Sequence, residues 1–182
     1  MAAVSLAEIN LRYVIEGRAL DVATESALRA DPRAGARAIL KAIGKRRFDN
    51  RSEGQRLRKL LRYENILWAD GIVRVAGVDE AGMSPLAGPV AAAAVIFGPR
   101  ARIPGVDDSK KLDAATRDHL ATEIRQTAIA WSVAFAEVEE IDTVNIYWAG
   151  ILAMRRAVEG LPKTPQHLLL DARRLKDVAI PQ

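Results

Sequence analysis

The chain has 182 residues, which is the size of one domain or of one domain with an extension. It contains no cysteine, so disulfide frameworks and thiolate metal sites are excluded, and it has no apolar run long enough for a membrane-spanning helix. The formal net charge of +4 favours a polyanionic partner, although a surface rich in lysine and arginine gives the same balance. We therefore expect a cytoplasmic protein without a membrane partner.

Residues 1–70 carry the start signals of three short helices. The first begins with a capping box at Ser5, and the second begins at the Asp31-Pro32 pair and would end at Gly44. A further capping-box pattern at Ser52 begins the third helix. The sequence thus predicts a helical N-terminal extension over residues 1–70, followed by the main domain over residues 71–182.

Eight basic residues lie between positions 45 and 62, against only two acidic ones. Such a segment could follow a phosphate backbone. It is equally compatible with a solvated helix face, because the basic residues alternate with an apolar stripe. The sequence leaves both interpretations open for the eight bases, which are Lys45, Arg46, Arg47, Arg51, Arg56, Arg58, Lys59 and Arg62.

A β-branched stretch at residues 73–78 predicts a strand that ends at two adjacent carboxylates, Asp79 and Glu80. Its apolar residues alternate in a way that predicts cover on most of both faces. A turn rich in glycine and proline follows, and residues 90–97 predict a second buried strand. Carboxylates at a strand end are either turn or cap residues or ligands of a hard divalent cation. The local pattern alone favours the first of these interpretations.

The remaining residues alternate between helical and extended patterns. Helices are predicted after residue 112 and over residues 144–158, with an acidic turn or short helix at 137–142, and strands over 128–135 and 167–170. Asp171 follows the last strand directly. The alternation predicts an α/β sheet. We expect Trp131 and Trp148 in the core, His119 on a solvated helix face, and His167 at a strand edge.

Several motifs in this order resemble bacterial ribonuclease HII, of the type 2 ribonuclease H family. The resemblance covers residues 73–171 and implies a ribonuclease H-like sheet with flanking helices. In that fold the first and fourth strands lie side by side, so that Asp79 and Asp171 converge. The motifs are Gly77-Val78-Asp79-Glu80-Ala81-Gly82, Pro85-Leu86-Ala87-Gly88-Pro89-Val90, Asp108-Ser109-Lys110-Lys111-Leu112, Ala130-Trp131-Ser132-Val133, Ile141-Asp142 with Asn145-Ile146, Ala153-Met154-Arg155-Arg156-Ala157-Val158-Glu159-Gly160, and Leu169-Leu170-Asp171.

The resemblance also implies a function. It implies a monomeric endonuclease that hydrolyses the RNA strand of RNA–DNA hybrids, or cuts 5′ of a ribonucleotide embedded in duplex DNA, by two-metal-ion catalysis with Mg²⁺ or Mn²⁺. The implied catalytic and metal-binding residues are Asp79, Glu80 and Asp171. The implied substrate-binding residues are Gly82, Met83, Ser84, Lys110 and Lys111.

Two departures from the family pattern bear on this function. The family has Gly-Arg-Gly where this chain has Gly82-Met83-Ser84, which removes a positive charge and adds a side chain at the motif that approaches the ribonucleotide 2′-OH. The resemblance implies that the family's fourth carboxylate lies beyond Gln182, so we expect a nuclease fold that is incomplete at the C-terminus. With both departures, we expect the chain to be nearly inactive on a single embedded ribonucleotide. A catalytically impaired relative that binds nucleic acid or protein is the alternative hypothesis.

Overall fold

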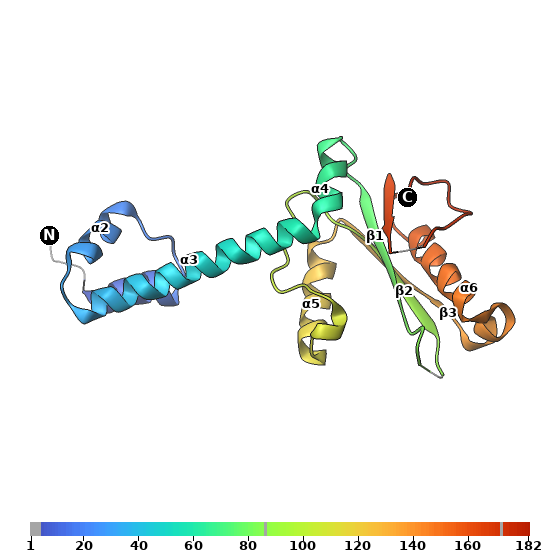
Figure 1. Ribbon diagram of the computed structural model, residues 1–182, viewed down its shortest axis with the longest axis horizontal. Coiled ribbons are helices and arrows are strands. Elements are labelled where there is room, and N and C mark those ends of the chain that lie inside the picture. Colours follow the sequence, from blue (N-terminus) through green and yellow to red (C-terminus); the bar gives the residue numbers. More distant parts are fainter. Residues whose placement is uncertain (1–4, 86, 172) are drawn as a thin grey trace. The chain divides into compact units, whose positions relative to one another are not determined.

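The computed structural model describes residues 5–85, 87–171 and 173–182. The chain divides into two compact units, Met1–Leu57 and Arg58–Gln182. The first unit is helical, and the second contains the sheet (Figure 1). The domain boundary at residue 70 stays a sequence-based prediction.

The helices of the N-terminal unit differ from those that the sequence predicts. Helix α1 (Leu6–Asn10) starts at the predicted cap, where Ser5 accepts a hydrogen bond from the Glu8 backbone, and continues into a π-helical turn, η1 (Leu11–Ile15). The sequence analysis missed α2 (Val22–Ala30). Helix α3 (Ala34–Leu60) runs for 27 residues, so the helix end predicted at Gly44 and the start predicted at Ser52 are both wrong.

Buried residues of α3 flank the predicted break, with Ala36, Ile39 and Ile43 before it and Leu57 after it. Between them the helix continues through Gly44 and Ser52 without a buried residue, and good helix formers such as Lys45, Arg46 and Arg47 favour this continuation. Polar contacts lie at the edge of this unit's core, where the Tyr13 hydroxyl donates a hydrogen bond to Asp21 at 2.7 Å. The Thr24 backbone N–H and then the Tyr13 hydroxyl hold the pKa of Asp21 at about 2.

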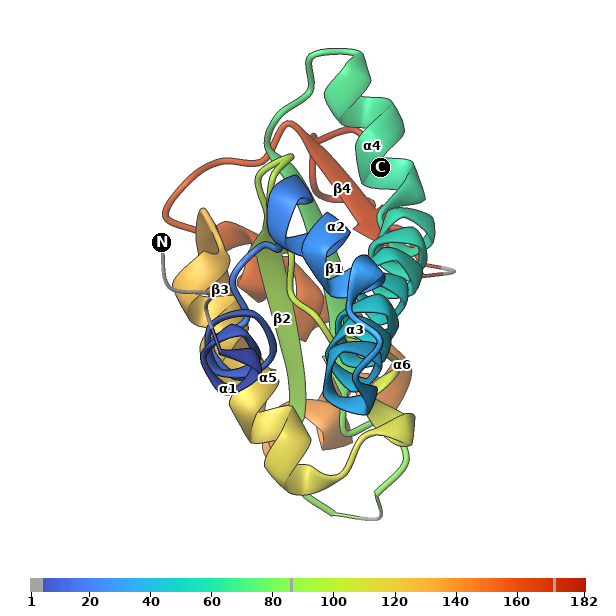
Figure 2. The same ribbon diagram turned by 90° about the vertical axis from the view of Figure 1, so that its left-hand side faces the viewer.

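The second unit is built on a four-stranded mixed sheet. Its strands are β1 (Val75–Ala81), β2 (Val90–Ile96), β3 (Ala130–Ala136) and β4 (His167–Leu170), in the order β3-β2-β1-β4. Strand β1 pairs antiparallel with β2 and parallel with β4, which lies beside it in Figure 2. The helices are α4 (Arg62–Ala69), the 3₁₀ turn η2 (Ser109–Lys111), α5 (Ala114–Thr127) and α6 (Val138–Glu159). The α/β class and the neighbouring first and fourth strands are confirmed.

Helix α6 packs along one face of the sheet (Figure 1). Small residues, Ala149, Ala153 and Ala157, are fully buried there and let the helix approach strands β1, β2 and β3 closely. On the opposite face Val75 is buried but Gly77 and Asp79 are exposed, so the expected cover on most of both faces of β1 is wrong. None of the helices in the described part of the chain combines the length and apolar composition of a membrane span.

The two tryptophans expected in the core are exposed. Trp131 lies on the face of β3 that points away from α6, because side chains alternate along a strand, and Arg125 lies over its ring. Trp148 is exposed on α6 and meets the neighbouring Tyr147 edge-on. Both expectations are therefore wrong.

Helix α6 is continuous over two elements that the sequence analysis predicts separately, the acidic segment 137–142 and the helix 144–158. It kinks at Asn145, whose φ of 70° is non-helical, and the Asn145 side chain accepts hydrogen bonds from the backbone N–H groups of Tyr147 and Trp148. The second part of α6 thus has its own N-cap. The first part begins with a capping box between Glu137 and Glu140.

Glu140 should make the stability of this unit depend on pH. Arg156 donates to its carboxylate at 2.6 and 2.7 Å, which is the main reason that the pKa of Glu140 falls to about 2. This contribution is complete above the ordinary glutamate pKa and is lost as pH falls towards 2. We expect Glu140→Gln to lower the melting temperature at neutral pH and to match the parent chain near pH 2. Melting curves across this range test it.

Glu139→Gln is the matched control, because Glu139 is the exposed neighbour in the same helical turn. It should leave the pH dependence of the melting temperature unchanged. Equal pH profiles for the parent chain and Glu140→Gln would contradict the prediction.

Candidate active site

The parallel pairing of β1 with β4 places two acidic residues at neighbouring strand ends. The last residues paired in this ladder are Val78 and Leu170. Asp79 and Asp171 each follow one position later, so their backbones are about one strand spacing apart. Both residues are exposed.

Asp79 and Asp171 both line one groove, which has a volume of about 990 Å³. The groove is otherwise mostly apolar, and its other acidic residue is Glu64 of α4. Asp79 is fixed locally by its own neighbour, since its Oδ1 accepts a hydrogen bond from the Glu80 backbone N–H at 2.9 Å. The remaining lining residues are Leu60, Tyr63, Gly77, Val78, Ala93, Val95, Leu169 and Leu170.

Glu80 does not line this groove. Successive side chains of a strand point to opposite faces, so Glu80 lies on the α6 side of β1. There its Oε1 pairs with Arg173 Nη2 at 3.0 Å. The three carboxylates singled out from the sequence are therefore split, two in the groove and one in an ion pair.

The donor set fits a hard divalent cation only in part. Asp79 and Asp171 offer exposed carboxylate oxygens in one groove, which is the ligand type that Mg²⁺ and Mn²⁺ prefer. Within residues 5–85, 87–171 and 173–182, however, no group of three His, Cys, Asp or Glu side chains could hold a metal ion. Glu80 would have to leave Arg173 to complete such a group.

The turn after β1 depends on Gly82. Its φ of +91° lies in the left-handed region, and a Cβ there would lie 2.9 Å from the carbonyl oxygen of Pro89. The next residue, Met83, is half-buried against the core below α6, whereas Ser84 is exposed. The backbone at Gly82 thus packs closely against Pro89, which a side chain would prevent.

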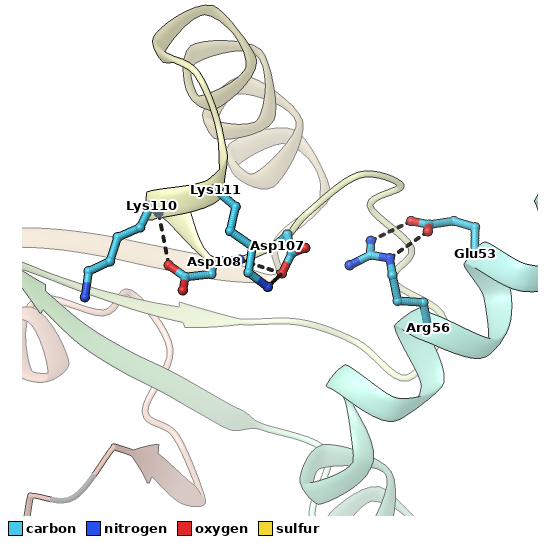
Figure 3. Close-up of polar contacts among 6 residues, drawn as sticks. All are labelled: Glu53, Arg56, Asp107, Asp108, Lys110 and Lys111. Carbon is cyan, nitrogen blue, oxygen red and sulfur yellow. Dashed lines mark hydrogen bonds and ion pairs between the residues drawn. The ribbon is translucent and has the colours of Figure 1, made fainter.

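Lys110 and Lys111 lie in the 3₁₀ turn η2. The Lys110 backbone N–H donates to Asp108 at 3.0 Å, and in Figure 3 the Lys110 ammonium points away from the labelled acids. Lys111 Nζ pairs with Asp107 at 3.3 Å. Both lysines are exposed, so they offer point charges rather than a preformed site.

Two residues of this region were missed by sequence reasoning. Glu64 lines the groove, and burial raises the pKa of its carboxyl. Arg173 holds Glu80. Neither residue belongs to a quoted motif, although the basic pair Arg173-Arg174, two residues after Asp171, was a visible signal for the second.

Comparison with known proteins identifies the family. A family model described as Ribonuclease HII matches residues 76–179. The chain belongs to the ribonuclease HII family. This confirms the resemblance seen in the motifs.

Among the curated relatives, ribonuclease HII of Anaeromyxobacter sp. (strain Fw109-5) is 55% identical over 182 residues, which cover 100% of this chain and 58% of the relative. Ribonuclease HII of Myxococcus xanthus (strain DK1622) is 54% identical over 179 residues, which cover 98% of this chain and 61% of the relative. The crystal structure of ribonuclease H2 from Pyrococcus horikoshii OT3 matches 58% of this chain and 51% of its own, with 28% identity and a TM-score of 0.49. The chain thus spans less than two thirds of the length of these relatives.

The turn of the ribonuclease HII motif should tolerate no side chain at Gly82. We expect Gly82→Ala to lower the free energy of unfolding by about 2 kcal/mol or more, because it combines a strained φ with a backbone clash. Gly77→Ala is the control, since a Cβ at Gly77 meets nothing within 4 Å. Urea unfolding of both variants measures the difference, and equal stabilities would contradict the account of the turn.

Proposed function

We propose that the chain is part of a ribonuclease HII-type endonuclease, which hydrolyses the RNA strand of RNA–DNA hybrids or cuts 5′ of ribonucleotides embedded in duplex DNA. The observation that carries the proposal is the presence of Asp79 and Asp171 at adjacent strand ends in one open groove, within a chain of this family. A cytoplasmic monomer fits the same proposal.

The proposed chemistry assigns a role to each motif. Asp79 and Asp171 would hold Mg²⁺ or Mn²⁺ in the groove, with Glu80 as a third ligand once it is free of Arg173. Bound divalent ions activate water and stabilise the charge that develops on a phosphodiester, and a pair of them can do both. The backbone at Gly82 approaches the sugar, and Lys110 and Lys111 supply positive charge for the phosphates.

Cleavage assays on an RNA–DNA hybrid and on duplex DNA with one ribonucleotide test this function. We expect cleavage that needs Mg²⁺ or Mn²⁺ and falls about 100-fold or more in Asp79→Asn, because several kcal/mol of charge stabilisation is lost. The hybrid should be the better substrate, because Met83-Ser84 lacks the family's arginine at the ribonucleotide motif.

Asp177→Asn is the control, since the Asp177 side chain is 82% exposed and does not line the groove. It should retain parental activity. Cleavage that survives Asp79→Asn, or that proceeds equally well in a chelator, would overturn the proposal, and so would the absence of cleavage of both substrates.

Several side chains of the basic run at residues 45–62 make polar contacts within the protein. Arg46 donates to the carbonyls of Tyr13 and Arg18, at 2.8 and 3.1 Å, and Arg47 pairs with Glu25 at 2.8 Å. Arg56 pairs with Glu53 at 2.7 Å (Figure 3). These three arginines stabilise the fold, so the broad run from the sequence is not a uniform phosphate-binding surface.

A narrower basic face remains on α3. Arg37, Lys41 and Lys45 are spaced by four residues, and Arg51 lies 14 residues after Arg37, which is close to four helical turns, so helical geometry places all four on one side. None of them takes part in an ion pair of the described residues. Phe48 lies among them and is 71% exposed. A row of free cations beside an exposed aromatic ring supports contact with a nucleic-acid backbone and its bases.

The salt dependence of binding tests this face. We expect Lys41→Gln/Lys45→Gln to weaken hybrid binding and to reduce the slope of log K against log salt by about 1.8, since each phosphate contact contributes about 0.9. Fluorescence anisotropy over a salt series measures the slope. Arg29→Gln/Arg33→Gln removes the same charge from paired side chains of the same unit and should leave the slope nearly unchanged. Equal slopes in the two double variants would assign the face to solvent.

A further inference from the structure

Arg173 is held on the α6 side of the sheet by more than its ion pair. Its Nη2 lies 3.0 Å from Glu80, and its guanidinium carbon lies 5.2 Å from the centroid of the Tyr147 ring. The side chains of Arg173 and Glu80 are only 18% and 15% exposed. The pair is therefore screened less by water than a surface ion pair.

Two features of α6 make room for this arginine. Asn145 caps the second part of the helix and thereby places Tyr147 in its first turn. Gly150 faces the guanidinium, since a Cβ on Gly150 would lie 2.9 Å from Arg173 Nη1 and 3.0 Å from Met83 Sδ. A side chain at position 150 would thus displace either Arg173 or Met83.

The arginine is not fully satisfied in this position. Arg173 Nη1 is buried and has no hydrogen-bond partner among the described residues. A buried donor without a partner costs free energy. The free energy of this arrangement would therefore fall if Arg173 Nη1 gained a hydrogen-bond acceptor. Glu80, in turn, lies on the side of β1 that does not line the groove of Asp79 and Asp171 because side chains alternate along the strand, and the ion pair with Arg173 holds its carboxylate there.

We propose that Arg173 is a positioning residue that neutralises Glu80 until a divalent cation binds, and that it must release Glu80 for the three carboxylates to act together. The inference rests on the proposed function, because it takes the groove as the cation site. Arg173 competes for Glu80 and also repels a cation near it, so both effects of its charge lower cation affinity. Once released, its guanidinium is free to accept an anionic group such as a phosphate.

Removing the charge of Arg173 should tighten cation binding. We expect Arg173→Gln to bind Mn²⁺ about fivefold more tightly or better, the lower end of typical coupling between two sites. The free-Mn²⁺ signal in electron paramagnetic resonance measures the affinity. Arg173→Lys keeps the charge and should match the parent chain, as should Arg174→Gln, which removes an exposed charge next to it.

The same variants differ in stability without metal. In a chelator, Arg173→Gln should melt at a lower temperature than Arg174→Gln, because Glu80 is left half-buried without its partner. Adding Mn²⁺ should narrow that difference. In the parent chain, saturating Mg²⁺ should shift the arginine Nε–H resonance that disappears in Arg173→Lys, and this readout does not depend on whether Arg173→Gln folds.

The outcomes separate this inference from the proposed function. If the parent chain binds Mn²⁺ and Asp79→Asn does not, but Arg173→Gln binds no more tightly than the parent, the inference is wrong and the proposed function is retained. An Arg173 resonance that does not move at saturating Mg²⁺ overturns the inference in the same way. If the parent chain binds no Mn²⁺ through Asp79, both are wrong.

Discussion

The parallel pairing of β1 with β4 is the constraint on which the candidate site depends. The two strands are 92 residues apart in sequence at the pairing of Val75 with His167, and their ladder ends at Val78 and Leu170. A shift of this register by one residue would move Asp171 away from Asp79 and turn the alternate side chains to the other face. The chemistry of the groove is thus set by strand register and not by any local motif.

The position of helix α6 on the sheet determines the environment of Glu80. Its buried alanines press the helix against β1 and β2, and the kink at Asn145 places Tyr147 beside Arg173. Because α6 covers one face of the sheet, the alternation of β1 divides the adjacent carboxylates between an open groove and a covered face. Adjacent acidic residues on a strand are therefore not equivalent, although the sequence presents them as a pair.

The four strands could be predicted from their apolar and β-branched runs, and the neighbouring first and fourth strands from the resemblance of the ordered motifs to a known family. Sequence signals failed where tertiary contacts decide. Helix α3 continues through Gly44 and Ser52 despite their local signals, and the exposed position of Trp131 depends on which face of β3 is covered. The roles predicted for Asp79, Glu80 and Asp171 stay predictions, and the Glu80–Arg173 pair could not be foreseen, since it joins side chains from separate segments.

The central claim is that Asp79 and Asp171 share a cation at the ends of β1 and β4. Anomalous difference density from crystals of the chain soaked in Mn²⁺ tests it most directly, because the metal is located without reference to activity. The account predicts a peak in the groove within bonding distance of oxygens from both Asp79 and Asp171. A groove without such a peak, with Mn²⁺ bound only elsewhere or to one of the two carboxylates alone, would contradict it.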